Sequence, residues 1–172
     1  MQVLFSSDFH LGHSNIHKFR TRFNSALEND QFILDQISQL NKRNILYVLG
    51  DFIFDTPKFE SYLTSIAKMP CQIRVVMGNH CSRVLYTQTI ASNVQVELPL
   101  FTYKQVWLSH CPIHPNEIRN RLGNIHGHLH HETLPDRRYF NVNIDVNDYK
   151  FVPLETILTS LRSANEPNSR AI

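Results

Sequence analysis

The feature that most constrains the fold is a repeated pattern of short apolar runs, each ending in a polar side chain. The runs cover residues 3–7, 45–50, 73–78 and 106–109, and they are followed in turn by Asp8, Asp51, Asn79 and His110. They have strand length, and near-continuous apolar character is typical of strands covered on both faces. Ligands of open α/β sheets collect outside the carboxyl ends of the strands. The pattern therefore predicts a buried sheet with functional side chains gathered at one edge.

Two amphipathic segments separate the first three runs and predict helices. In residues 24–41, Asn24 or Ser25 suits the N-cap position. In residues 56–69, Thr56 is a candidate N-cap and Pro57 suits the first turn. Alternation of strands and helices predicts a parallel sheet.

The second half of the chain has a different character. Residues 93–98, 102–110 and 138–145 resemble strands with little helix between them, which predicts antiparallel pairing. A last helix is expected over residues 154–161. We therefore expect one domain over residues 1–161, followed by a polar, flexible tail over residues 162–172.

Composition narrows the class of protein. A length of 172 residues fits one compact domain, and the net charge of +2 is too small to argue for duplex binding. Three cysteines without a CxxC pair argue against a disulfide framework. The N-terminus lacks the pattern of a signal peptide, and the sequence has no apolar run long enough to span a membrane. We expect a soluble, cytoplasmic protein with no membrane partner.

The ten histidines are the unusual feature of the composition, and most lie beside Asp, Asn or Gly. Two divalent ions about 3.5–4 Å apart need several N or O ligands and a bridging group. The spacing of Asp8 with His10, and of His128 with His130, would direct both side chains of an extended segment to one side. Because no thiolate is required, the ligands suit Mn, Fe, Zn, Ni or Co. We expect Mn.

Five motifs in order resemble the calcineurin-like metallophosphoesterase superfamily, in particular a small, single-domain bacterial or phage-type member. They are Asp8-Phe9-His10, Gly50-Asp51, Gly78-Asn79-His80, His110 and Gly127-His128-Leu129-His130. The stretches HLGHSNIHKF, LSHCPIHP and NVNIDV are similar to that subgroup. The resemblance implies a four-layer α/β/β/α sandwich and a dinuclear metal site. The implied metal ligands are Asp8, His10, Asp51, Asn79, His110, His128 and His130.

The resemblance also implies a role for each ligand. Asp8, His10, Asp51 and His130 would hold one ion, while Asp51, Asn79, His110 and His128 would hold the other. Asp51 would thus be the bridge, and a metal-bridging hydroxide would attack phosphorus. His80 would be catalytic rather than a ligand, and would stabilise the transition state or protonate the leaving oxygen. Cys81 stands where the family commonly has Asp or Glu. This difference bears on the pKa or orientation of His80 more than on metal binding.

The expected activity is hydrolysis of phosphodiesters, of the nucleotide or nucleic-acid-end type, in preference to phosphomonoesters. His10 and His80 together suit a leaving group whose departure needs assistance, as in a diester. The chain is also too short for a large specificity cap, which favours an open groove. His13 could touch substrate or equally be a loop histidine. Arg20 could bind a phosphate, although a solvated surface charge is the plainer interpretation. The alternative is a catalytically silent scaffold that retains the fold; nucleic-acid binding without chemistry is disfavoured by the absence of a basic run.

Overall fold

A computed structural model describes residues 1–81 and 92–165 of the chain. Its larger sheet has five strands in the order β4-β3-β2-β1-β9. The four strands from β4 to β1 are parallel, as predicted, and β9 pairs with β1 antiparallel. The strands are β1 (Gln2–Ser6), β2 (Asn44–Leu49), β3 (Gln72–Val76), β4 (Val94–Val96) and β9 (Val152–Pro153).

The smaller sheet corrects the prediction of antiparallel strands in the second half. Its order is β5-β6-β7-β8, and only the β5–β6 pair is antiparallel. Lys104 and Gln105 join that pair with positive φ values of 48° and 68°, the backbone of a tight hairpin turn. The later strands pair in parallel because longer connections lie between them. The strands are β5 (Leu100–Tyr103), β6 (Val106–Ser109), β7 (Gly123–His126) and β8 (Tyr139–Asn141).

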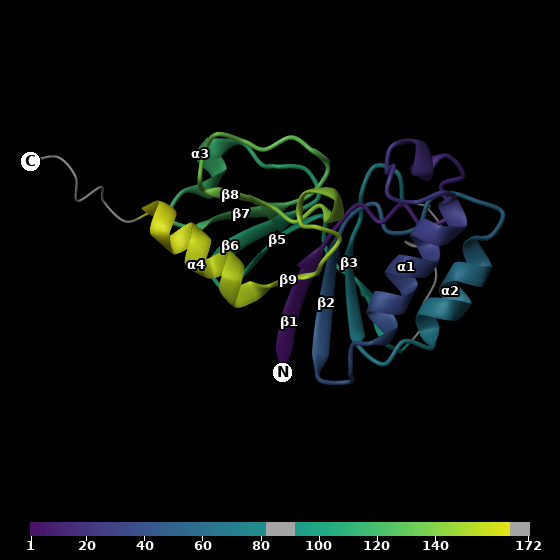
Figure 1. Ribbon diagram of the computed structural model, residues 1–172. Helices are drawn as coiled ribbons and strands as arrows, with labels where there is room; N and C mark the ends of the chain where they lie inside the picture. The colour runs from purple at the N-terminus through teal and green to yellow at the C-terminus, as the bar shows by residue number, and fades with distance from the viewer. Residues whose placement is uncertain (82–91, 166–172) are drawn as a thin grey trace, which may run out of the picture.

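Helices lie on both sides of the two sheets (Figure 1). On one side, α1 (Ala26–Ser38) begins after Ser25, whose hydroxyl accepts the Glu28 N–H and so confirms the predicted cap. Beside it, α2 (Phe59–Ala67) starts later than predicted, because residues 56–58 form a turn in which Phe59 N–H donates to the Thr56 carbonyl. On the other side, α4 (Leu154–Asn165) extends beyond the predicted helix. The rest of the predicted tail, residues 166–172, lies outside the described residues.

Short helical segments lie in the connections within the part of the chain that the structure describes. They are η1 (Ile16–Lys18), α3 (Pro115–Ile118) and η3 (Ile144–Val146). Within the described ranges, no helix combines the length and apolar character needed to cross a membrane.

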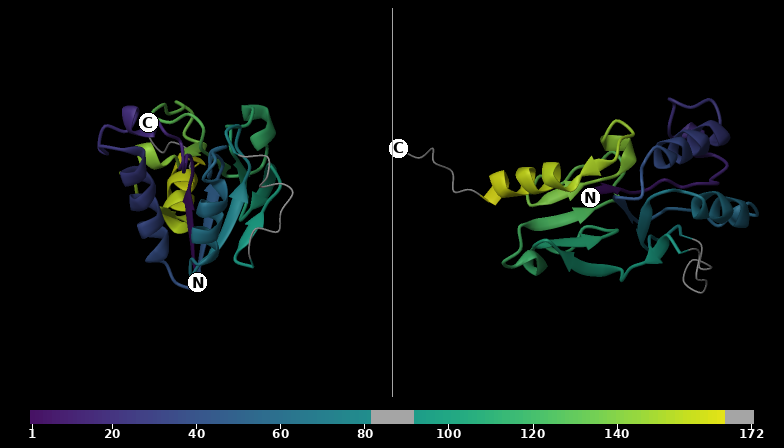
Figure 2. Two further views of the ribbon diagram at one scale, coloured as in Figure 1. Left: turned by 90° about the vertical axis from the view of Figure 1, so that its right-hand side faces the viewer. Right: turned by 90° about the horizontal axis from the view of Figure 1, so that it is seen from below.

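Two apolar clusters hold these layers together. On one face of β2, Leu46 and Val48 pack in the cluster that includes Ile33 of α1 and Ile66 of α2. The alternate residues of β2 point to its other face, toward the smaller sheet. Tyr47 is one of them and belongs to a second cluster, which includes residues of α4. Because strand side chains alternate, burial of both sets explains the continuous apolar run. The structure therefore confirms a mixed α/β fold with two sheets between helices (Figure 2).

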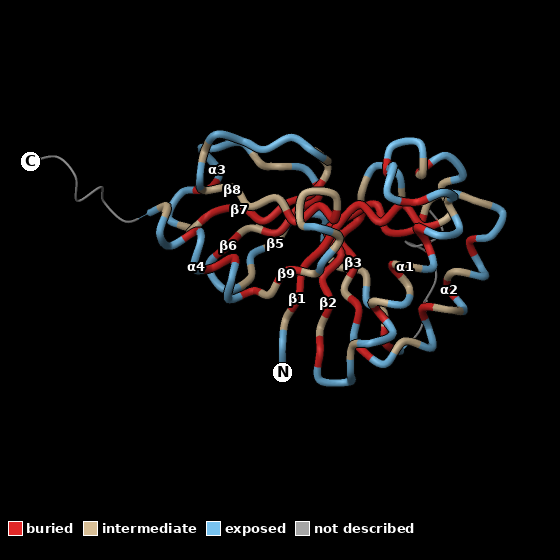
Figure 3. Tube along the Cα trace, viewed as in Figure 1, coloured by how far each residue is buried: buried red, intermediate tan, exposed pale blue. Residues whose placement is uncertain are grey.

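The carboxyl ends of the central strands converge on one buried region (Figure 3). Backbone hydrogen bonds tie the loops together there. Asp8 N–H donates to the Gly50 carbonyl at 3.0 Å, and Gly127 N–H donates to the His110 carbonyl at 2.9 Å. Each of these bonds joins two loops of the same sheet, and the His128 N–H, which donates to Asp8 Oδ2 at 3.0 Å, joins the loops of the two sheets.

Candidate metal centre

All seven predicted ligands lie in this convergent region, and each follows a strand. Asp8 follows β1, Asp51 follows β2, Asn79 follows β3, His110 follows β6, and His128 and His130 follow β7. His10 lies on the same loop as Asp8. The structure thus brings together side chains that are more than a hundred residues apart in the sequence.

Asp51 lies between two histidines. Its Oδ2 is 3.7 Å from His10 Nε2 and 3.4 Å from His110 Nε2. Its Oδ1 accepts the backbone N–H of His80 at 2.8 Å. Burial opposes ionisation, but hydrogen bonding and charge from His110 hold the pKa of Asp51 below its usual value. An ionised carboxylate between two imidazoles is suited to bridge a pair of cations.

One side of the centre contains His110, His128 and Asn79. Asn79 Oδ1 is 2.9 Å from His110 Nε2 and 3.1 Å from His128 Nδ1. His110 Nδ1 is 2.9 Å from the Leu49 carbonyl, which can only accept. The Nδ1 atom therefore donates to that carbonyl, and Nε2 is the nitrogen that faces Asn79 and Asp51, where a metal would take the place of its hydrogen.

The other side contains Asp8, His10 and His130, whose ligand atoms all lie within 4.8 Å of one another. Asp8 also receives the backbone N–H of His128, at 3.0 Å to Oδ2. The Nδ1 atom of His130 is 3.0 Å from Asp145 Oδ2. This hydrogen bond fixes the orientation of the imidazole and leaves Nε2 as the nitrogen that a metal could use.

His10 provides a test of whether a metal fits here. Its side chain is 6% exposed, and neither ring nitrogen has a hydrogen-bond partner. Burial lowers the pKa of His10 to about 3, so the ring is neutral with a free lone pair. A buried polar group without a partner is costly, and each such group calls for an explanation. A cation between His10, Asp8 and Asp51 would supply the missing partner, so the residues present fit a metal.

Glycines leave the space that this arrangement needs. A Cβ atom at Gly50 would overlap the imidazole of His110, and one at Gly78 would overlap the carboxylate of Asp51. A Cβ atom at Gly127 would overlap the side chains of Ser7 and Asp8. No larger residue is compatible with these three close approaches.

The backbone at the ligands differs from the extended segments that the i, i+2 spacing predicted. Positive φ values of 47–69° occur at Asp8, His10, Asp51, His128 and His130. Such values are uncommon for residues other than glycine, and strained conformations cluster at functional sites. The chain therefore turns sharply at each ligand, and these turns bring the side chains together.

The sequence profile of the calcineurin-like phosphoesterase family matches residues 1–167. The chain belongs to this family. An uncharacterized protein of Methanocaldococcus jannaschii is 28% identical over 166 residues, covering 91% of this chain and 89% of that protein. The crystal structure of a protein of unknown function from Aquifex aeolicus superposes with a TM-score of 0.70 at 25% identity, covering 91% of this chain and 97% of that one. The family membership makes the chain a metal-dependent phosphoester hydrolase.

The sequence pattern alone assigns no role to Asp145 of the phosphoesterase, which lies in the stretch NVNIDV. Asp145 lies in η3, where its N–H donates to the N-cap Asn143 Oδ1, and its side chain is 2% exposed. It contacts both His130 and Arg20. Cys111, which the motifs do not include, has its thiol sulfur within 4.8 Å of ligand atoms of His110 and His128.

Arg20 of the phosphoesterase is buried rather than on the surface, with 2% of its area exposed. All five of its N–H donors are used within the protein. They bind the Asp145 carboxylate, the carbonyls of Asp8 and Phe9, and the side chain of Asn29. No donor remains for a substrate phosphate, so the predicted contact with substrate gains no support, and the expected solvated charge is wrong.

His80, the predicted catalytic histidine of the phosphoesterase, lies at the open side of the centre. Its ring centroid is 5.6 Å from that of His10 and 5.7 Å from that of Phe54. Cys81 beside it is turned to the backbone, with Sγ accepting the Gly78 N–H at 3.3 Å. Burial raises the pKa of the Cys81 thiol, so this position has no charge where the family commonly has an acid.

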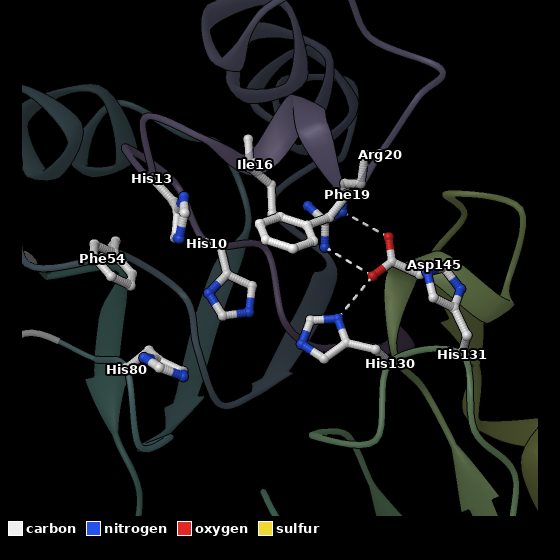
Figure 4. Close-up of a pocket in the computed structure, with 10 residues that line it drawn as sticks. All are labelled: His10, His13, Ile16, Phe19, Arg20, Phe54, His80, His130, His131 and Asp145. Atoms are coloured by element: carbon white, nitrogen blue, oxygen red, sulfur yellow. Dashed lines mark hydrogen bonds and ion pairs between the residues drawn. The ribbon is translucent and has the colours of Figure 1, made fainter.

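A pocket of about 480 Å³ adjoins this open side of the phosphoesterase centre (Figure 4). Its described lining combines apolar side chains with histidines and one buried ion pair. The lining residues are His10, His13, Ile16, Phe19, Arg20, Phe54, His80, His130, His131 and Asp145. The predicted substrate contact His13 is therefore in the pocket wall.

Proposed function

We propose that this phosphoesterase hydrolyses phosphodiesters, of the nucleotide or nucleic-acid-end type, at a pair of divalent ions. The observation that carries the proposal is the position of the Asp51 carboxylate between two groups of ligands, 3.7 Å from His10 and 3.4 Å from His110. Bound there, two ions would supply a hydroxide nucleophile at neutral pH and offset charge on the phosphoryl oxygens. Manganese is the first ion to test, because imidazole and carboxylate ligands accept it.

The residues of the chain have separate tasks in this proposal. Asp51 sets the spacing between the two ligand groups, while Leu49 and Asp145 fix the imidazoles of His110 and His130. His80 presents its imidazole at the open side, where it can hold a proton for the leaving oxygen. The neutral Cys81 adds no negative charge that would compete with the phosphate.

We favour a diester over a monoester because the rings of His10 and His80 lie 5.6 Å apart, which suits a leaving oxygen that must be protonated. The pocket also has room for an organic group on the phosphate. Ile16, Phe19 and Phe54 provide an apolar wall next to His10 and His80. An organic group on the phosphate would therefore find a matching surface beside the reaction centre.

The test is an assay of metal-stripped protein on bis-p-nitrophenyl phosphate with Mn, Ni, Zn or Mg restored singly. We expect metal-dependent turnover that is lost in Asp51→Asn, because the amide removes the bridging charge. Asp136→Asn is the matched control, since Asp136 pairs with Arg138 on the surface. Faster turnover of p-nitrophenyl phosphate would contradict the diester preference. Bound metal without turnover on either ester would favour the silent scaffold, with Cys81 as the first residue to replace.

A further inference from the structure

A row of aromatic rings leads from the surface to the metal centre. The ring centroids of Phe19 and His13 are 6.3 Å apart, those of His13 and Phe54 are 4.5 Å apart, and those of Phe54 and His80 are 5.7 Å apart. We call these four side chains the aromatic row. It ends at His80, whose ring is 5.6 Å from that of His10. A group attached to a phosphate at the centre would lie against the row.

Phe19 is the outer member of the row. It is 70% exposed, although it follows directly on η1, which the buried Ile16 anchors. Isolated exposed apolar residues are common on protein surfaces. Phe19 differs because its ring lines the pocket, 6.3 Å from the ring of His13 (Figure 4). Its open ring face is thus available to a ligand in the pocket.

The charges of the pocket restrict what this ligand can be. Arg20 and Asp145 pair with each other at 2.6 Å, and Arg20 has no free N–H donor. Among the described lining residues, no other arginine and no lysine faces the pocket to hold a second phosphate. The described lining thus offers aromatic rings rather than an unpaired arginine or lysine, and flat uncharged rings stack well on aromatic side chains.

We propose that the aromatic row is a base-binding subsite, which holds the nucleobase of the ester while the phosphate lies at the metal centre. The proposal rests on the proposed function and deepens it by naming nucleoside esters as the substrate class. A volume of about 480 Å³ lies within the usual range for small-ligand pockets.

The test compares two ligands that differ only in the base. Isothermal titration of manganese-loaded protein with adenosine 5′-monophosphate and with ribose 5-phosphate gives a ratio of dissociation constants. We expect adenosine monophosphate to bind at least about tenfold more tightly, the effect of one stacked base. Phe19→Ala should bring the ratio close to one and leave the affinity for ribose 5-phosphate unchanged. Phe19→Trp should preserve the ratio.

The matched control is Leu27→Ala, which removes an apolar side chain of similar exposure, 68%, on α1 outside this pocket. It should leave both affinities as they are. Equal binding of the two ligands by the unaltered protein would overturn the subsite. If Phe19→Leu kept the full ratio of dissociation constants, the subsite would also be overturned, because apolar contact without stacking would then suffice.

Binding of the sugar phosphate separates this inference from the proposed function. If ribose 5-phosphate fails to bind while adenosine monophosphate binds in a manner that depends on Phe19, the subsite stands and the phosphate site is overturned. If neither ligand binds, the subsite is overturned, while the proposed function is decided separately by turnover of bis-p-nitrophenyl phosphate.

Discussion

At the scale of single residues, a buried chain of contacts positions one candidate ligand. Arg20 Nε lies 2.6 Å from Asp145 Oδ1, and Asp145 Oδ2 lies 3.0 Å from His130 Nδ1. Burial opposes ionisation, yet the hydrogen bond from His130 and the charge of Arg20 hold the pKa of Asp145 at about 2. Asp145 is therefore a carboxylate at neutral pH and can accept the Nδ1 hydrogen of His130. The contact fixes the orientation of this ring and increases its basicity.

We expect Asp145→Asn to weaken metal binding about 10- to 100-fold, because a neutral amide orients His130 less firmly and makes it less basic. Equilibrium dialysis against manganese measures the affinity without any need for turnover. Asp136→Asn, at an acid that pairs with Arg138 on the surface, should leave the affinity unchanged. An Asp145→Asn protein with the affinity of the unaltered protein would show that the contact has no positioning role.

At the scale of elements, the helices stabilise the fold and the loops after the strands form the site. The α1 helix illustrates the first task, because Ile33 is fully buried against the larger sheet while Leu27 faces solvent. The loops illustrate the second, because their glycines allow ligands and backbone to approach closely. Substitutions in the helices should therefore lower stability, whereas substitutions in these loops should also lower metal affinity.

We expect Ile33→Ala to reduce the free energy of unfolding by about 2–5 kcal/mol, because it removes buried apolar contacts and leaves a cavity. Leu27→Ala on the same helix should change it by about 0.5 kcal/mol or less. Urea denaturation followed by circular dichroism measures both values. Equal losses in the two variants would contradict the packing of α1 described above.

Gly127→Ala should lower metal affinity, since the added Cβ would overlap Asp8 and Ser7. Gly12→Ala is the matched variant. There the added Cβ would lie 2.7 Å from Thr56 Cγ2 and 2.9 Å from Tyr62 Cε2, away from the ligands. Both variants should lose stability, by about 1–3 kcal/mol, but only Gly127→Ala should lose metal in equilibrium dialysis. Normal metal binding by Gly127→Ala would mean that the loop can move without affecting the centre.

At the scale of the whole molecule, metal binding and folding are coupled. The ligands come from both sheets, so the centre exists only when the two sheets are packed together. Five candidate ligands also have strained backbone, and His10 has two unpartnered nitrogens. Both costs are present before any ion binds, and a bound ion would offset them.

We therefore expect manganese to raise the melting temperature. At a free concentration of one hundred times the dissociation constant, each ion adds about 2.7 kcal/mol. For a chain of this size the melting temperature should rise by about 5–10 °C per ion, which differential scanning calorimetry can measure. The Asp51→Asn protein should show a smaller rise. A rise of the same size in that variant would indicate stabilisation by ions bound elsewhere.

The sequence by itself determined the alternation of strands and helices in the first half and the family. It also identified the side chains that the structure brings to one edge of the sheets. These features depend on apolar periodicity and on short motifs, which are properties of neighbouring residues. The metal-binding role of the seven ligands and the catalytic role of His80 stay predictions.

Only the tertiary structure decided how the strands of the second sheet pair, how the backbone turns at Asp8 and His130, and what Arg20 does. Arg20 looked like a surface charge because nothing near it in sequence neutralises it. Its partner Asp145 is 125 residues further along the chain. Contacts at such separations depend on how the two sheets pack, and a buried guanidinium is stable only where that packing supplies its acceptors.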